Sequence, residues 1–236
     1  MSNSDEPSKL VIPEELQHLV DETSEKKSRQ LRGWAEQSFK DHELSLVESG
    51  EKVEVWYCGR PDGSSVYHFY VAFTPHAISV YGDIGDMLIR PGWNRGLGWL
   101  RSALHDGADE HFSYLLGKVP SHRAKKNFFP GDVIEHLQEE AAGRNGYFDE
   151  DQCLAKSQEL IDEWAERVGY SYIDGGEPRD WWDACNAKGL DYEYAGGFED
   201  YDSDMYWCAY ALRWFVRKWV ATYEAGEAGA EAHPLP

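Results

Sequence analysis

The sequence predicts an α+β fold, in which a four-stranded antiparallel meander sheet over about residues 51–90 is covered by N-terminal and C-terminal helices. Apolar and polar residues alternate with period two only in this middle part, whereas apolar residues recur at helical spacing on both sides of it. Short turns rich in Gly, Pro and Asp separate the alternating segments, as they do in a meander. Most of the expected helices follow the sheet in the chain, which is typical of this class.

Turn sequences set the limits of the expected strands. Arg60-Pro61-Asp62-Gly63 is a strong turn signal, because proline presets one backbone torsion and glycine accepts a positive one. Thr74-Pro75-His76 and Gly82-Asp83-Ile84-Gly85 mark the next two turns. The expected strands are therefore 52–58, 66–73, 77–81 and 86–90.

Helical patterns occupy the rest of the chain. Before the sheet they extend over 11–48, opened by Pro13 and reaching Leu44. After the sheet, Asp132 with Glu135 three residues later has the spacing of a capping box, which predicts that Asp132 caps a helix. Further helices are expected over 99–104, 111–116, 149–168, 178–187 and 205–223.

The domain organisation follows from these patterns. Residues 1–10 are expected to be disordered, residues 11–223 to form a single α+β domain, and residues 224–236 to form a flexible tail. Within the domain the sequence predicts a helical part (11–48), the β-meander (51–90) and a helical acidic part (99–223). The apolar stretch 205–220 is shorter than the roughly 20 residues of a membrane span and contains three basic residues, so we expect a core or interface helix and no membrane contact.

Cysteine usage indicates the compartment. The four cysteines form no CxxC pair, and the polar first ten residues lack the apolar segment of a secretory signal peptide. Reduced thiols are typical of a reducing cytoplasm, so we expect a cytoplasmic protein. A metal site built from these cysteines is not expected.

The charge is uneven along the chain. The net charge is -20, and residues 149–204 alone carry -13 while residues 51–100 carry -1. Acidic tails that stay unfolded are poor in aromatic residues, whereas this acidic segment is rich in Trp and Tyr. It therefore predicts a folded body with a negative face, which repels nucleic acid and attracts basic surfaces.

The turn Gly82-Asp83-Ile84-Gly85-Asp86 is the tightest candidate for chemistry. Asp83 and Asp86 could hold a divalent cation or act as an acid/base pair, with His68 and His76 on neighbouring strands or turns. The simpler interpretation is that Asp and Gly only build the turn, and that these histidines pack or face solvent. Common nucleotide-binding and hydrolase motifs are missing from the sequence, and no cofactor is expected.

A basic cluster stands out against the acidic background. Arg123, Lys125 and Lys126 could bind a phosphate group. They could also pair with the chain's own acidic residues, or with a second copy in a homodimer, or simply lie in a solvated loop.

The segment 191–204 is the candidate partner-binding surface. Carboxylates spaced along it could imitate the phosphates of a nucleic-acid backbone and so bind the Lys and Arg residues of a protein that normally holds DNA or RNA. Trp181 and Trp182 precede it and could serve as exposed anchors. An acidic solvated loop is the simpler alternative. The expected contact residues in the segment are Asp191, Glu193, Glu199, Asp200, Asp202 and Asp204.

A resemblance supplies a setting for these features. Residues 66–118 loosely resemble uncharacterised accessory proteins of bacteriophages, through Tyr81-Gly82-Asp83-Ile84-Gly85 and Tyr114-Leu115-Leu116-Gly117-Lys118. The resemblance covers under a quarter of the chain and implies no catalytic residues. It implies a viral protein that acts in the cytoplasm of a bacterial host, for example by blocking CRISPR–Cas or restriction.

Three hypotheses follow for the function. The leading one is an acidic, non-enzymatic binding protein that inhibits a host nucleic-acid-handling defence complex by occupying its basic surface, without binding nucleic acid itself. The first alternative is a small metal-dependent hydrolase or nucleotide-handling enzyme that uses Asp83 and Asp86. The second alternative is a nucleotide-sequestering protein with a cationic pocket near Arg123.

Overall fold

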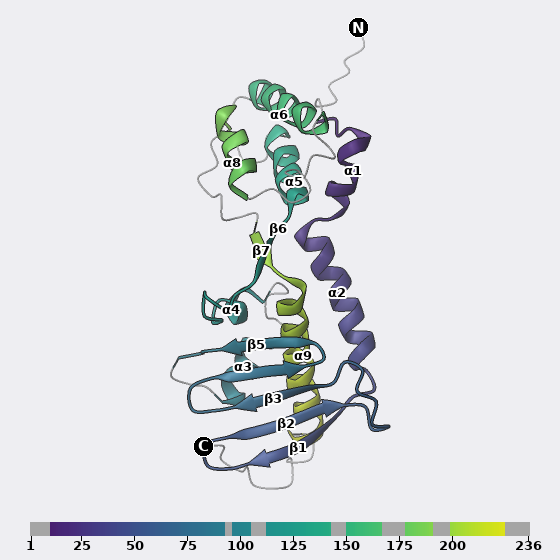
Figure 1. The fold of residues 1–236 in the computed structure, drawn as a ribbon, viewed down its shortest axis with the longest axis vertical. Helices are drawn as coiled ribbons and strands as arrows, with labels where there is room; N and C mark the ends of the chain where they lie inside the picture. Colours follow the sequence, from purple (N-terminus) through teal and green to yellow (C-terminus); the bar gives the residue numbers. More distant parts are fainter. Residues whose placement is uncertain are drawn as a thin grey trace. The chain divides into compact units, whose positions relative to one another are not determined.

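The computed structural model describes residues 10–92, 96–104, 112–142, 150–166, 178–190 and 199–224, and it confirms the α+β class (Figure 1). The chain divides into two compact units. Residues 28–125 and 201–236 form the first, called here the sheet unit, and residues 1–27 and 126–200 form the second, the helical unit. A single folding domain stays a prediction, since two compact units can still unfold together.

The sheet unit contains a five-stranded antiparallel sheet in which every strand pairs with the next along the chain. The meander predicted from the alternation is present, with strand boundaries shifted by at most three residues. Glycines at the β4–β5 turn take positive φ values, as the turn prediction required. The strands are β1 (Glu43–Ser49), β2 (Glu54–Gly59), β3 (Phe69–Phe73), β4 (Ile78–Gly82) and β5 (Gly85–Ile89).

The first strand corrects the sequence prediction, which assigned residues 11–48 to helices and expected four strands. The preceding helix ends at Phe39, and β1 pairs with β2 so that Leu44 lies opposite Cys58. The register shifts between Leu46 and Glu48, which marks a bulge. Leu44 therefore reaches the core as a strand residue, and its apparent helical spacing was misleading.

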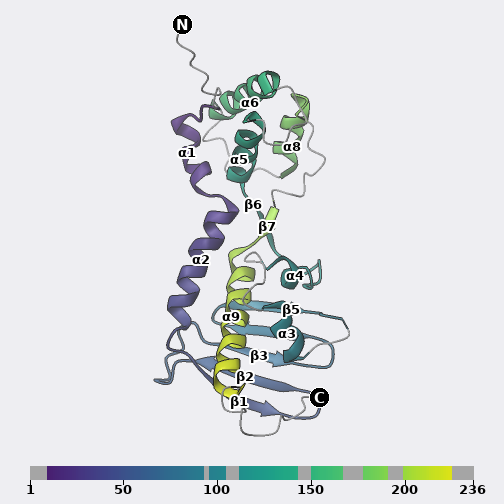
Figure 2. The ribbon, with the colours of Figure 1, turned by 180° about the vertical axis from the view of Figure 1, so that it is seen from behind.

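Helices cover one face of this sheet and build the core of the unit (Figure 2). The strand residues on that face are buried, and the ring of Phe215 contacts Trp56 and Phe73 at centroid distances of 6.1 and 5.9 Å. The helices are α2 (Ser24–Phe39), α3 (Leu97–Ala103), α4 (Ser113–Leu116) and α9 (Ser203–Trp219), followed by a π-helical turn (Val220–Glu224).

The helical unit has its own apolar core. Trp181 packs on Trp164 with a centroid distance of 4.1 Å and on Phe128 at 5.7 Å. The helix predicted over 178–187 is confirmed. The elements are α1 (Glu14–Asp21), α5 (Pro130–Ala141), α6 (Glu150–Ala165), α8 (Pro178–Ala187) and the short paired strands β6 (Lys126–Phe128) and β7 (Glu199–Tyr201).

Asp132 lies in the first turn of α5 and does not cap this helix, contrary to the capping-box prediction. Helix α5 begins at Pro130, a residue type favoured at the first helical position. The Asp132 carboxylate instead accepts a hydrogen bond from the backbone N–H of Ser24, the first residue of α2, at 2.9 Å. It therefore satisfies a donor at the start of a different helix, and burial raises the pKa of this carboxyl.

Two further expectations can be compared with the structure. None of the described helices is long and apolar enough to cross a membrane. All four cysteines are buried and free of disulfide bonds. Of the expected flexible ends, 1–10 and 224–236, residues 1–9 and 225–236 lie outside the described residues. Leu10 is buried in the helical unit, and Glu224 is the last residue of the π-helical turn.

Candidate functional site

Asp202, expected to contact a partner, has a structural role. It is the N-cap residue of α9, and its carboxylate accepts the backbone N–H of Met205 at 2.9 Å. Its own N–H donates to the carbonyl of Lys125 at 3.1 Å. These contacts hold the start of α9, so Asp202 is partly withdrawn from any partner.

Asp204 and Lys125 bring two separately predicted sites together. The Lys125 Nζ lies 3.7 Å from the Asp204 carboxylate, and both side chains are more than half exposed. Part of the basic cluster thus pairs with the chain's own acidic residues, which was one of the alternatives. Such an exposed pair contributes little to stability. Arg123 lies in an exposed turn, and Lys126 begins β6.

Trp181 is not an exposed anchor, contrary to the expectation. It is 2% exposed and packs in the core of the helical unit, and its indole N–H finds no hydrogen-bond partner among the described residues. Asp200 lies in β7 and is half-buried. Asp191 and Glu193, and the side chains of Trp182 and Glu199, lie outside the described residues.

Asp83 and Gly82 both have structural roles in the turn after β4. The Asp83 carboxylate accepts the N–H of Tyr67 at 2.8 Å, and Tyr67 has a left-handed backbone with φ of 59°. A Cβ at Gly82, where φ is 150°, would lie 2.5 Å from the His68 carbonyl oxygen, so only glycine fits there. Building the turn is therefore a sufficient role for both Asp83 and Gly82.

The structure does not gather the four residues of the proposed hydrolase site. His68 and Asp83 lie at one end of the β3–β4 hairpin, and His76 lies in the turn at its other end. Asp86 is paired with Tyr81 within the sheet. No group of three or more potential metal ligands occurs among the described residues.

The division into units reveals where the negative charge lies. The helical unit contains 26 Asp and Glu residues against 9 Lys and Arg residues, a net charge of -17, and the sheet unit carries only -3. On α6 the acidic residues are close enough for one lysine to bridge two of them: Lys188 Nζ lies 2.8 Å from Glu159 and 2.5 Å from Glu163. These hydrogen bonds raise the pKa of Lys188.

The acidic residues of the helical unit come from several elements, which sequence proximity alone did not reveal. Glu14 and Glu15 begin α1, Glu135 lies on α5, and Glu166 follows α6; all four are exposed. The sequence analysis placed the acidic surface within 149–204. The structure adds N-terminal residues and α5 to the same compact unit.

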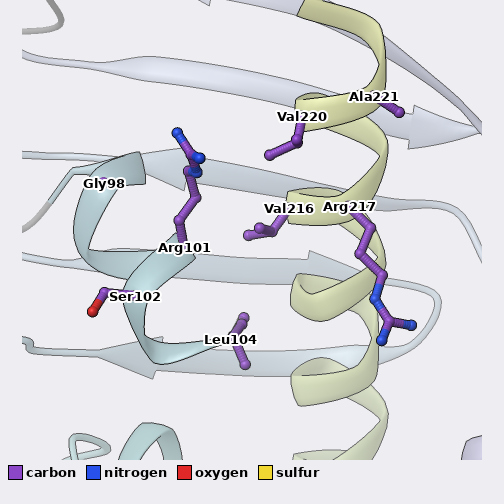
Figure 3. A pocket seen from close by; sticks show the side chains of 8 residues that line it. All are labelled: Gly98, Arg101, Ser102, Leu104, Val216, Arg217, Val220 and Ala221. Atoms are coloured by element: carbon purple, nitrogen blue, oxygen red, sulfur yellow. The ribbon is translucent and has the colours of Figure 1, made fainter. Parts of the chain in front are cut away.

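A cleft of about 590 Å³ lies between α3 and α9 in the sheet unit (Figure 3). Its wall is apolar, with Leu104, Val216 and Val220, and Ser102 lies at its border with the hydroxyl directed away from α9. Arg101 extends from α3 along the gap, whereas the guanidinium of Arg217 is directed away from α3. Its size is that of a small-molecule site. No local sequence pattern indicates this cleft, because α3 and α9 are far apart in the chain.

Comparison with protein-family models, with curated proteins and with solved structures found no match to this chain.

Proposed function

We propose that this chain is a binding protein whose acidic helical unit occupies a basic surface of a partner protein. The observation that carries the proposal is the concentration of charge: -17 of the total -20 belongs to one compact unit with its own apolar core. A folded body of this charge attracts a positive groove and speeds the encounter with it.

The partner class follows from the same charge. Extended basic surfaces occur on proteins that hold the phosphate backbone of DNA or RNA. A partner of this kind would lose nucleic acid when the helical unit binds, and the chain would act as an inhibitor by competition. Within this proposal, a phage protein that blocks a bacterial defence complex of the CRISPR or restriction type is the biological setting.

The residues that would make the contact differ from those expected first. Asp202 and Trp181 have structural roles, and Asp204 pairs with Lys125. Exposed carboxylates on α1, α5 and α6 take their place as contact residues. The best four for mutation are Glu14, Glu15, Glu135 and Glu166.

The test is a pull-down from bacterial lysate at about 0.1 M and about 0.5 M salt, a change that roughly halves the Debye length. Three baits are compared: the native protein, a variant with the four carboxylates changed to Gln, and a control with four exposed carboxylates of the sheet unit changed to amides. The control positions are Glu36, Asp41, Glu51 and Asp62.

The proposal expects nucleic-acid-binding proteins to be captured by the native bait and the control at low salt. It expects them to be lost at high salt, with the helical-unit variant, or when excess DNA is added. Capture that is equal for all three baits, or that persists at high salt, would contradict the proposal.

The cleft between α3 and α9 favours a second candidate, the binding of a small anion with an apolar body. Arg101 supplies donors for a phosphate or carboxylate, and the apolar wall accommodates the rest of the ligand. The probe is a set of nucleoside mono- and triphosphates in a thermal-shift assay. A stabilisation that is lost in Arg101→Ala supports this candidate, and no stabilisation by any of them contradicts it.

A further inference from the structure

The face of the sheet opposite the helices carries a row of tyrosines. Tyr57 lies directly opposite Tyr70, and Tyr70 directly opposite Tyr81, on three adjacent strands. The ring centroids are 5.1 Å apart for the first pair and 5.2 Å for the second, which is stacked with an interplanar angle of 12°. His68 adds a fourth ring, 6.0 Å from Tyr57 and 6.1 Å from Tyr70. The register thus builds a continuous aromatic surface across β2, β3 and β4.

Strand alternation explains why this row faces away from the core. The strand residues next to Tyr57 and Tyr70, namely Trp56 and Cys58 on β2 and Phe69 and Val71 on β3, are buried under the helices, as is Val80 before Tyr81. Tyr81 is 40% exposed, and none of the described helices lies over this face (Figure 1). The helices are in front of the sheet only in the opposite view (Figure 2).

Gly59 shapes one end of the row. A Cβ at this position would lie 2.3 Å from the Tyr57 hydroxyl oxygen and 2.5 Å from the Cζ atom of its ring, so the tyrosine lies along β2 over the glycine. Any other residue would displace the ring. Gly59 therefore allows Tyr57 to lie along the strand.

Carboxylates border the row at both ends. The register places Asp86 beside Tyr81 at one end, and Glu43 opposite Gly59 at the other. Asp83 follows β4 next to His68. Two cations follow strands next to the row: Arg60 comes directly after Gly59 at the end of β2, and Arg90 comes directly after β5. Tyrosine faces flanked by carboxylates suit a planar guanidinium, because the ring attracts the cation and the carboxylate accepts its N–H groups.

We infer that this tyrosine face (Tyr57, Tyr70 and Tyr81, bordered by Glu43, Asp83 and Asp86) binds an arginine-bearing polypeptide segment. The charge of the face disfavours nucleic acid, whose bases could otherwise stack on such a row, because phosphates would meet the carboxylates. The inference goes beyond the proposed function, since this face belongs to the sheet unit and does not depend on the -17 charge of the helical unit.

The test uses a short labelled peptide with arginine at alternate positions and measures its affinity by fluorescence anisotropy. A matched peptide carries citrulline, which keeps the shape of arginine without its charge. The key variant is Tyr81→Leu, with Tyr81→Phe as the conservative replacement that keeps the ring. Trp34→Leu, at an exposed aromatic residue on α2, is the control for a general loss of aromatic surface. Urea denaturation of each variant shows that it is folded.

We expect Tyr81→Leu and Asp86→Asn each to weaken arginine-peptide binding about threefold to tenfold, while Tyr81→Phe and Trp34→Leu leave it within about twofold. We expect the citrulline peptide to bind at least about tenfold more weakly. Equal affinity for both peptides, or equal loss in Trp34→Leu and Tyr81→Leu, would overturn the inference. So would Tyr81-dependent binding of single-stranded RNA, or Tyr81-dependent self-association in sedimentation.

This experiment separates the two proposals. The helical-unit variant, with Glu14, Glu15, Glu135 and Glu166 changed to Gln, should keep the difference between Tyr81→Leu and Tyr81→Phe. If that difference remains while lysate capture is insensitive to the four carboxylates, the tyrosine face stands and the proposed function fails.

Discussion

Replacing Asp202 tests whether this residue has a structural role or a charge role. Asp202→Ala removes the acceptor of the Met205 N–H at the start of α9, and loss of such a cap costs about 1 kcal/mol, with a range of roughly 0.5–2. Asp202→Asn keeps an acceptor of nearly equal capping strength but loses the charge that interacts with the helix dipole, about 0.3–1 kcal/mol. Alanine should therefore be the more destabilising replacement.

The loss of this cap should destabilise the whole sheet unit, because α9 supplies much of the core of that unit. Met205, Cys208 and Phe215 on this helix are all buried in the cluster that includes the sheet. For a unit of this size, 1 kcal/mol corresponds to about 3–5 °C in Tm. The assay is urea and thermal unfolding followed by the fluorescence of the buried tryptophans and by circular dichroism.

Two results would refute the capping argument for Asp202. One is an Asp202→Ala protein as stable as the native protein. The other is an Asp202→Asn protein as destabilised as the alanine variant, because the charge and not the hydrogen bond would then matter. Both variants should capture partners with the same efficiency as the native protein does, since the Asp202 carboxylate is bonded to the backbone of its own chain.

Three further predictions follow from buried groups and close contacts. Burial lowers the pKa of His42, so the unfolded chain binds a proton more readily than the folded chain does. The free energy of unfolding should therefore fall as the pH drops below about 6.5, by at most about 1.4 kcal/mol per pH unit. The variant His42→Phe should reduce this slope in urea titrations. An unchanged slope in that variant would contradict the assignment. Gly131→Ala should destabilise the protein by about 1–3 kcal/mol, because the added Cβ would lie 2.2 Å from the Leu19 carbonyl oxygen. Gly33→Ala, whose Cβ would have no atom within 4 Å, should instead stabilise α2 by up to about 1 kcal/mol. Equal effects of the two substitutions in thermal unfolding would refute this contrast. The four thiols should resist a disulfide reagent in the native state and react fully in urea, because all of them are buried. Burial also raises the pKa of Cys58, Cys208 and Cys185, the last to about 12. Fast reaction of the folded protein would contradict this prediction.

Local sequence signals were sufficient for most of the sheet. The turn around Gly82 was predictable because its glycines have a conformational role, and the alternation of β2 to β5 follows from one buried face. Strand β1 was missed because most of its side chains are exposed and a bulge interrupts its alternation. An edge strand of this kind has little periodicity to detect.

The candidate sites were less predictable, because they depend on contacts between distant parts of the chain. The spacing of Asp132 and Glu135 fits a capping box equally well whether or not Ser24 is nearby. Lys125 and Asp204 belonged to two separate hypotheses until the fold paired them. The sequence shows each tyrosine of the row only as a separate strand residue. That the three lie side by side depends on the register of β2, β3 and β4.

Trp181 illustrates the same point for the acidic region. A tryptophan within an acidic segment could be an exposed anchor or the core around which the acidic residues fold. Its 2% exposure and its packing on Trp164 show that it belongs to the core. The aromatic content of the helical unit thus explains how a body with a charge of -17 stays folded.

The most direct test of the central claim is the dependence of partner affinity on ionic strength. The affinity of the captured protein is measured from about 0.1 to about 0.5 M salt for the native chain, the helical-unit variant and the sheet-unit control. The account predicts that log affinity falls steeply with log salt for the native chain and the control, and clearly less steeply for the helical-unit variant. The same slope for all three proteins would show that the charge of the helical unit does not drive binding.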